Sequence, residues 1–203
     1  MDEYPPLVEQ ARTLAREMGF PLTRQESAAG HGGPSASLPG VGQFLAVLAA
    51  GCHGGRIGEI GTATGVAAAW MASVMPPDCT LVTVEIDGPR AAAAVGLLAA
   101  DGRVTVLSGD ARALLGPHAP FDLLFADGGW RDPDGLGTLV DLVRVGGQLV
   151  MDDVTPLRRL PHDSPLRSGD VKRELLFGDP RLCSAEVVLP DLENSLLVGT
   201  RLS

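Results

Sequence analysis

Three acidic residues stand at or near the ends of successive apolar segments, where they could bind the polar groups of a ligand. Glu59 lies in R-I-G-E-I, Glu85 ends T-L-V-T-V-E, and Asp110 lies in S-G-D-A-R. Glu59 could accept a hydrogen bond from a ligand ammonium, Glu85 could accept both hydroxyls of a ribose, and Asp110 would lie at an adenine edge. A structural interpretation also stands, in which Glu85 or Asp87 caps the next helix and Asp110 caps a helix beginning at Ala111.

The turn after the first of these segments carries the glycine pattern E-x-G-x-x-x-G, formed by Glu59, Gly61 and Gly65. The two glycines let the backbone approach a ligand closely. A dinucleotide fingerprint, G-x-G-x-x-G, would need glycine where Ala63 and Val66 stand, and no G-K-[ST] follows as in a P-loop. The pattern therefore predicts a nucleotide-sized cradle at a helix N-terminus, but neither a dinucleotide site nor a P-loop.

A second acidic group follows the next two apolar segments. Asp127 ends F-D-L-L-F-A-D, and Asp152 and Asp153 end Q-L-V-M-D-D. If the two segments are neighbouring strands, the three carboxylates meet at one edge, and such hard oxygen ligands suit Mg²⁺ or another divalent cation. The ion could bind two adjacent acceptor hydroxyls and lower the pKa of one of them. Metal-free binding at this edge stays open, because aspartate is also common before a Gly-Gly turn such as the one after Asp127.

The elements that must position these residues alternate between strand and helix from residue 56 onward. Apolar runs of about five residues, rich in Val, Ile and Leu, are typical of strands buried on both faces of a parallel sheet. We therefore predict an α/β fold with a Rossmann-like, doubly wound sheet, followed by a C-terminal antiparallel hairpin around P-D-L-E-N. The predicted strands are 56–60, 80–85, 103–107, 121–126, 147–151, 183–189 and 195–201, and the predicted helices are 5–18, 39–51, 65–74, 89–100, 111–115, 136–143 and 171–176.

The length of 203 residues suits a single domain over 1–203, with an N-terminal helical and lid segment at 1–50 and the Rossmann-like core at 51–203. The loop 20–34 could close over a ligand or serve only as a linker. The net charge of −9 argues against nucleic acid as a partner. No apolar run is long enough to span a bilayer and no signal-peptide pattern begins the chain, so we expect a cytoplasmic protein without a membrane partner.

Together these stretches resemble the small class I S-adenosylmethionine-dependent O-methyltransferases of the catechol and caffeoyl-coenzyme A type. They run in family order: L-P-G-V-G-Q-F-L (38–45), E-I-G-T-A-T-G (59–65), V-E-I-D (84–87), S-G-D-A-R (108–112), F-D-L-L-F-A-D (121–127) and V-G-G-Q-L-V-M-D-D-V (145–154). The resemblance implies a seven-stranded, mostly parallel sheet and S-adenosyl-L-methionine as the cofactor. The cofactor site predicted in this way comprises Glu59, Gly61, Gly65, Glu85, Asp110, Ala111 and Asp127.

The acceptor side departs from the family pattern. Metal-dependent members carry D-A-D-K and D-N, so Asp127 and Asp152 match two metal ligands, and Asp153 stands at the asparagine. The family's lysine position holds Trp130, and Lys172, the only lysine, lies on a different element. We therefore do not expect a lysine base. The predicted catalytic residue is Asp127, acting either through a metal-bound hydroxyl or as one of the carboxylates on the acceptor side.

Three functions remain open at this point. The first is an O-methyltransferase for a small hydroxylated, aromatic molecule, with or without a divalent cation. The second is a metal-independent methyltransferase with an acceptor that is not a catechol. The third is a nucleotide-binding module without methyl transfer. The expected partners are a small-molecule acceptor and, because the family is commonly dimeric, a second copy of the chain.

Overall fold

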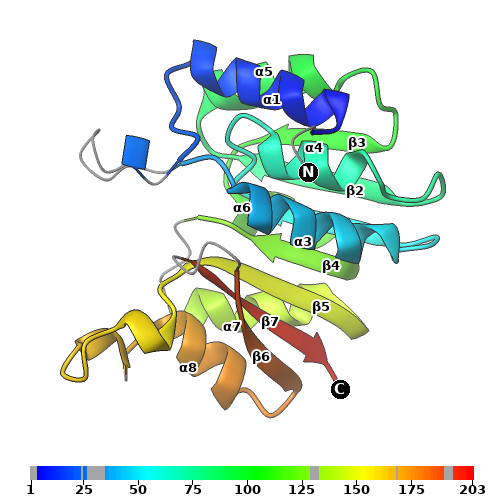
Figure 1. The fold of residues 1–203 in the computed structure, drawn as a ribbon. Helices are drawn as coiled ribbons and strands as arrows, with labels where there is room; N and C mark the ends of the chain where they lie inside the picture. The colour runs from blue at the N-terminus through cyan, green and yellow to red at the C-terminus, as the bar shows by residue number, and fades with distance from the viewer. Residues whose placement is uncertain (1–3, 24, 27–34, 129–132, 168, 190–193) are drawn as a thin grey trace.

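The computed structural model describes residues 4–23, 25–26, 35–128, 133–167, 169–189 and 194–203. Within these residues one sheet is formed by β1 (Arg56–Ile60), β2 (Thr80–Glu85), β3 (Val104–Ser108), β4 (Phe121–Ala126), β5 (Val143–Val154), β6 (Leu182–Val188) and β7 (Ser195–Arg201). The order across the sheet is β3-β2-β1-β4-β5-β7-β6 (Figure 1). Neighbours from β3 to β5 are parallel, whereas β7 is antiparallel to both β5 and β6. The predicted doubly wound sheet and its C-terminal antiparallel hairpin are confirmed.

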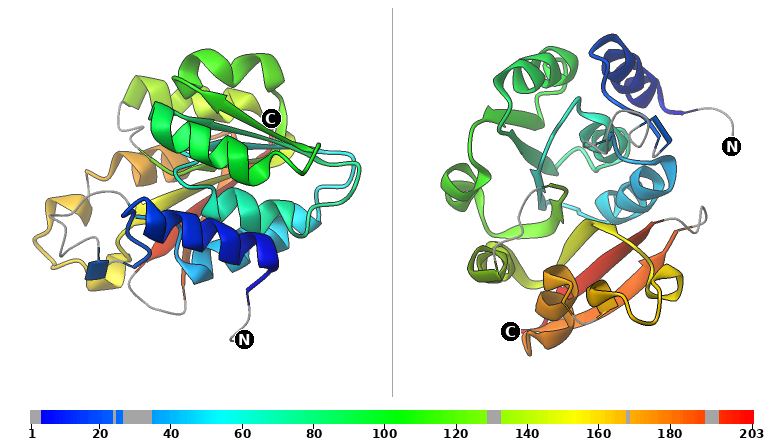
Figure 2. Two further views of the ribbon diagram at one scale, coloured as in Figure 1. Left: turned by 90° about the horizontal axis from the view of Figure 1, so that it is seen from above. Right: turned by 90° about the vertical axis from the view of Figure 1, so that its left-hand side faces the viewer.

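Helices cover both faces of this sheet, as the view along its edge shows (Figure 2, right). The hydrophobic cluster on one face includes residues of α3, α4 and α5, and the cluster on the other face includes residues of α6, α7 and α8. None of the helices among the described residues is long and apolar enough to cross a membrane. The helices are α1 (Pro6–Glu17), α3 (Pro39–Ala50), α4 (Val66–Ala72), α5 (Gly88–Leu98), α6 (Ala111–Leu114), α7 (Pro133–Leu142) and α8 (Val171–Gly178), with short 3₁₀ turns η1 (Gly116–His118), η2 (Leu157–Arg159) and η3 (Pro165–Arg167).

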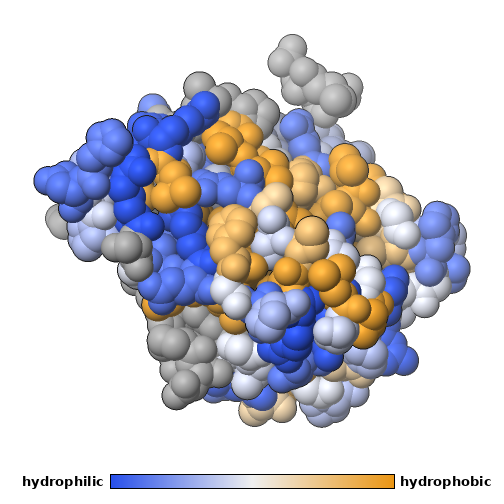
Figure 3. All heavy atoms as spheres, turned by 90° about the horizontal axis from the view of Figure 1, so that it is seen from below, coloured by the Kyte–Doolittle hydropathy of each residue, from blue (hydrophilic) through white to orange (hydrophobic). Residues whose placement is uncertain are grey.

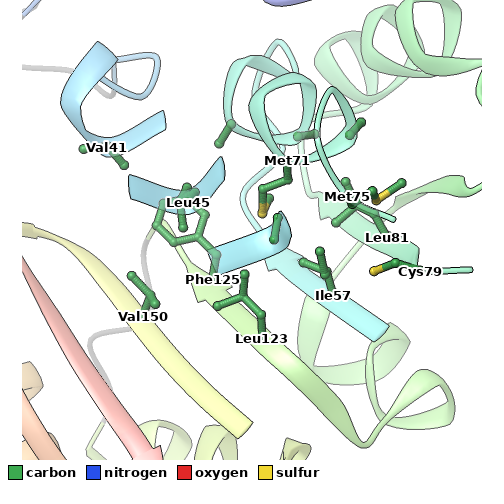
Figure 4. Packing of buried hydrophobic residues seen from close by; sticks show 14 of the residues in the cluster. Val41, Leu45, Ile57, Met71, Met75, Cys79, Leu81, Leu123, Phe125 and Val150 are labelled. Atoms are coloured by element: carbon green, nitrogen blue, oxygen red, sulfur yellow. The ribbon is translucent and has the colours of Figure 1, made fainter. Parts of the chain in front are cut away.

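The core lies in two layers because successive strand residues point to opposite faces of the sheet. Leu123 and Phe125 of β4 pack with Leu45 of α3 and Met71 of α4 (Figure 4). Leu124, between them, belongs to the cluster on the other face. Burial on both faces is thus confirmed for the central strands. It is wrong for β3, which is an edge strand and is only partly buried.

The first helix buries one face. Val8, Ala11 and Ala15 of α1 are buried, whereas Met18, which follows the helix, is 39% exposed. Helix α1 packs against α4, with Trp70 in the shared cluster, and so forms an outer layer over the helix that follows the glycine turn. Most of the predicted lid loop lies outside the described residues.

Candidate active site

A cavity of about 440 Å³ opens at the carboxyl ends of β1, β2, β3 and β4. This is where open parallel sheets bind ligands, because the loops that follow neighbouring strands diverge there. Phe20 and Ser35, which stand on either side of most of the predicted lid loop, also line the cavity. The predicted site residues that line it are Gly61, Glu85, Asp110, Ala111, Asp127 and Asp153.

Gly61 forms the turn after β1 and lines the cavity. Its φ is +90°, and its N–H donates to the Val84 carbonyl at 2.9 Å. A Cβ at this position would lie 1.9 Å from the carbonyl oxygen of Asp127, so only glycine lets the two strand ends approach so closely. Gly65 also has a positive φ, of +84°, but it is the N-cap of α4 and does not line the cavity.

Glu85 is held in a fixed orientation at the end of β2, and its side chain is almost fully buried. Its Oε2 accepts from the Ala63 N–H at 2.7 Å, and its Oε1 accepts from the Asp87 N–H at 2.9 Å. Arg90 donates to the same Oε1 at 3.1 Å. Asp87, rather than Glu85, caps α5 by accepting from the Arg90 N–H. The carboxylate of Glu85 therefore faces the cavity in one defined position.

Glu59 lies beneath this layer, fully buried, and does not line the cavity. Thr83, its neighbour in register on β2, donates to Oε2 at 2.5 Å, and the Thr83 hydroxyl is itself paired with Thr62. The other oxygen, Oε1, has no hydrogen-bond partner among the described residues. Burial, opposed by the Thr83 hydrogen bond and reinforced by the charge of Glu85, raises the pKa of Glu59 to about 7. An unpaired buried carboxylate oxygen fits a ligand that brings an ammonium group.

The position of Asp110 is compatible with both interpretations of its role. Its Oδ1 accepts from the Arg112 N–H at 2.9 Å, which makes it the N-cap of α6, and it also lines the cavity. Ala111 is buried beside it and lines the same wall. The cap fixes the side chain at the carboxyl end of β3, so the structural role and the predicted contact with an adenine edge are compatible.

Asp127 follows β4 and faces the same cavity. Its N–H donates to the Ile60 carbonyl at 2.9 Å, and its Oδ2 lies 3.4 Å from the Ser37 hydroxyl, which donates to it. Burial raises the pKa of Asp127 well above the ordinary range, and the charges of Asp152, Asp153 and Glu59 raise it further, against a smaller lowering by Lys172. Asp127 is thus a carboxyl group at a cavity wall that holds its proton more tightly than usual.

The other two predicted metal ligands differ in position. Asp152 is buried, and its Oδ1 accepts both from Asn194 at 2.5 Å and from the Asp153 N–H at 2.7 Å. Burial and the charge of Asp153 raise the pKa of Asp152 to about 6, against lowering by these hydrogen bonds and by Lys172. Asp153 is exposed, lines the cavity and has a φ of +62°. Asp127 and Asp153 therefore share the cavity wall, while Asp152 lies behind it.

Lys172 also contacts an acidic residue at this edge. It does lie on a different element, α8, but the fold brings it to the acidic edge. Its Nζ donates to the backbone carbonyl of Asp152 at 2.6 Å. Its charge lowers the pKa values of both Asp127 and Asp152. Lys172 thus contributes a positive charge to this edge from α8, although residue 130, where the family has a lysine, is a tryptophan.

The residues present do not fit a divalent cation well. Asp127, Asp152 and Asp153 are all described, yet no group of three or more His, Cys, Asp or Glu that could hold a metal occurs among the described residues. One oxygen of Asp152 already accepts two hydrogen bonds, and an ammonium contacts its carbonyl. A divalent ion prefers several free oxygen ligands and no neighbouring cation. The metal site stays a prediction that this geometry does not favour.

Two polar residues that contact the acidic group were not predicted from the sequence. Ser37 and Asn194 contact Asp127 and Asp152 across 90 and 42 positions of the chain, and only their polar character beside apolar segments could have indicated them. Trp130, at the family's lysine position, lies outside the described residues.

Known proteins are similar to this chain in sequence and in fold. A methyltransferase domain family matches residues 59–154. A Mycobacterium tuberculosis H37Rv protein classed as an O-methyltransferase is 34% identical over 171 residues, covering 78% of this chain and 76% of that protein. The O-methyltransferase TomG from Streptomyces achromogenes, involved in tomaymycin synthesis and solved in complex with S-adenosylmethionine, is 27% identical with a TM-score of 0.71, covering 99% and 92% of the two chains. The O-methyltransferase from Bacillus cereus, solved with S-adenosylhomocysteine, shares the fold at 20% identity, with a TM-score of 0.74 and coverage of 99% and 93%.

The chain therefore belongs to the O-methyltransferase family, and it is an S-adenosylmethionine-dependent methyltransferase. The resemblance drawn from the sequence is confirmed. The alternative of a nucleotide-binding module without methyl transfer is set aside, because the methyltransferase family matches residues 59–154, which hold most of the parallel core.

Proposed function

We propose that the cavity binds S-adenosylmethionine beside a small hydroxylated, aromatic acceptor, which the enzyme methylates on oxygen. The observation that carries this proposal is that the two predicted half-sites line one cavity. Glu85 and Asp110 line it together with Asp127 and Asp153. Its volume of about 440 Å³ lies within the usual range for small-molecule sites.

The residues of the chain then have distinct roles. Glu85 accepts hydrogen bonds from the ribose hydroxyls. The unpaired oxygen of Glu59 accepts a hydrogen bond from the ammonium of the cofactor. The bound cofactor supplies an electrophilic methyl group on a sulfonium sulfur. The acceptor oxygen uses a lone pair to form the new C–O bond, the S–C bond breaks with its electron pair passing to sulfur, and Asp127 takes the hydroxyl proton.

Assistance by a divalent cation, predicted at Asp127, Asp152 and Asp153, enters no step of this mechanism. The reason is the poor fit described above. One carboxylate oxygen of Asp152 already accepts two hydrogen bonds, and the Lys172 ammonium contacts the backbone carbonyl of the same residue. Catalysis then depends on the position of the acceptor and on the charged groups around it.

The cofactor half is tested by calorimetry with S-adenosylmethionine. We expect saturable binding by the wild-type protein and at least about tenfold weaker binding by Glu85→Gln, because a charged acceptor of ribose hydrogen bonds is lost. The control is Asp87→Ala, which removes the α5 cap and lowers stability by about 1 kcal/mol but leaves the affinity unchanged. Absence of binding at millimolar cofactor would refute the proposed function.

The acceptor half is tested by a screen of catechols and other hydroxylated aromatic compounds, with S-adenosylhomocysteine formation as the readout. For any compound that is turned over, Asp127→Asn should lower kcat by about 100-fold or more, because the group that receives the proton is lost. An Asp127→Asn variant that keeps wild-type turnover would show that another group takes the proton.

We also propose that two copies of the chain form a homodimer through the C-terminal end of the sheet. There β6 is an edge strand, and Phe177 and Val188 are 54% and 38% exposed. Figure 3 shows this side of the molecule, where hydrophobic residues lie between groups of hydrophilic ones. An exposed edge strand favours pairing with another chain. Sedimentation equilibrium should show a dimer that Phe177→Asp dissociates; a monomeric wild-type protein would contradict the proposal.

A further inference from the structure

The position of Lys172 is determined by contacts at the start of α8. Asp170 caps the helix by accepting from the N–H groups of Lys172 and Arg173. The buried Arg173 then bonds the Thr155 carbonyl at 2.7 Å and the Glu186 carboxylate at 3.0 Å. The first turn of α8 is thereby anchored to the end of β5 and to β6. The lysine side chain consequently starts from a rigid base.

From this base the ammonium reaches the carboxyl end of β5. Nζ lies 2.6 Å from the carbonyl oxygen of Asp152, a short charge-assisted hydrogen bond. Lys172 thus places an ammonium group at the end of the strand that carries Asp152 and Asp153. It is the only lysine in the chain. The Lys172 ammonium therefore lies at the edge of the sheet where metal-dependent members of the family would bind a divalent ion.

We propose that Lys172 supplies the positive charge of the acidic edge formed by Asp127, Asp152 and Asp153, and that this edge consequently binds no divalent cation. The inference rests on the proposed function, because it concerns the acceptor side of that site. The Lys172 ammonium contacts the backbone carbonyl of Asp152, so a divalent ion bound by Asp152 would lie near a like charge and be repelled by it. Lys172 acts here as a positioning residue, because it holds the end of β5 that carries Asp153.

This arrangement has a consequence for the acceptor. A metal ion selects molecules that offer two neighbouring oxygens to chelate it. With a lysine in that role and no ion, an acceptor needs only one hydroxyl within reach of Asp127. The enzyme should therefore accept compounds with a single hydroxyl as readily as those with an adjacent pair.

The test is calorimetric titration of Mn²⁺ into the protein loaded with S-adenosylhomocysteine. We expect no saturable binding to the wild type up to about 1 mM, the weak end of divalent-ion sites in proteins. Lys172→Met should bind Mn²⁺ at least about tenfold more tightly, because the repelling charge is gone. Lys172→Arg keeps the charge and should behave as the wild type. Arg158→Met removes one exposed positive charge on η2 and should also leave Mn²⁺ binding unchanged.

Two outcomes overturn the inference. The first is saturable Mn²⁺ binding by the wild type that Asp127→Asn abolishes, a result that does not require any lysine variant to fold. The second is a folded Lys172→Met protein, verified by thermal unfolding, that binds Mn²⁺ no better than the wild type. Neither result bears on binding of S-adenosylmethionine to the wild type, so failure of the inference is distinguishable from failure of the proposed function.

Discussion

Replacing Glu59 by glutamine removes one buried charge and keeps the shape of the side chain. Glu59 has no exposed surface, and its Oε2 accepts from Thr83 at 2.5 Å, a hydrogen bond that a glutamine oxygen can also accept. Burial is the main cause that raises the pKa of Glu59 from its ordinary value of 4.5 to about 7. The substitution therefore separates the energetic cost of ionising Glu59 from the packing of the side chain.

The size of the effect follows from the two pKa values. Because the folded state binds the proton more tightly than the unfolded state, the folded protein loses stability as the pH rises from about 4.5 to about 7. A difference of about 2.5 pKa units corresponds to about 3 kcal/mol. The loss is complete above pH 7 and absent well below 4.5. Glu59→Gln has no such proton to lose, so it should be more stable than the wild type by about 3 kcal/mol at pH 8 and nearly equal to it at pH 4.5.

The assay is urea unfolding of both proteins at pH 4.5 and pH 8, with Glu174→Gln, an exposed change on α8, as the control. At pH 8 calorimetry should also show at least about tenfold weaker binding of S-adenosylmethionine by Glu59→Gln, because the ammonium loses its charged partner. A stability difference between wild type and Glu59→Gln that is the same at both pH values would refute the reasoning. So would unchanged affinity for the cofactor.

Two further predictions concern the framework of the site. Gly61→Ala should lower the free energy of unfolding by at least about 3 kcal/mol in urea, because φ is +90° and the new Cβ would lie 1.9 Å from the Asp127 carbonyl oxygen. Gly102→Ala, where a Cβ would have no atom within 4 Å, should be nearly neutral. Equal losses of stability in the two variants would contradict this prediction. Arg173→Met should cost about 3–5 kcal/mol in the same assay, because it leaves the Glu186 carboxylate without its buried partner, and adding Glu186→Leu should recover part of the loss. No recovery would mean that packing, not charge, dominates.

The strands were predictable because each is a local apolar run. The predicted bounds of β1, β2, β4 and β7 agree with the structure, whereas β5 begins earlier and ends later than its apolar stretch. Pairing decides those ends: β5 bonds to β4 on one side and to β7 on the other, so residues that look like a turn join the sheet. The partial exposure of β3 likewise follows from its place at the edge, which composition does not reveal.

What the sequence determined by itself was that acidic residues gather at one edge of the sheet. Parallel strands joined by helices bring their carboxyl ends to one edge, so the acids that end successive strands lie close to one another there. Only the tertiary structure decided that Glu59 lies beneath that cavity, that Asn194 occupies an oxygen of Asp152, and that Lys172 reaches the acidic edge. These contacts join elements that are distant in the chain, and no local pattern of residue types encodes which side chains will meet when the elements pack.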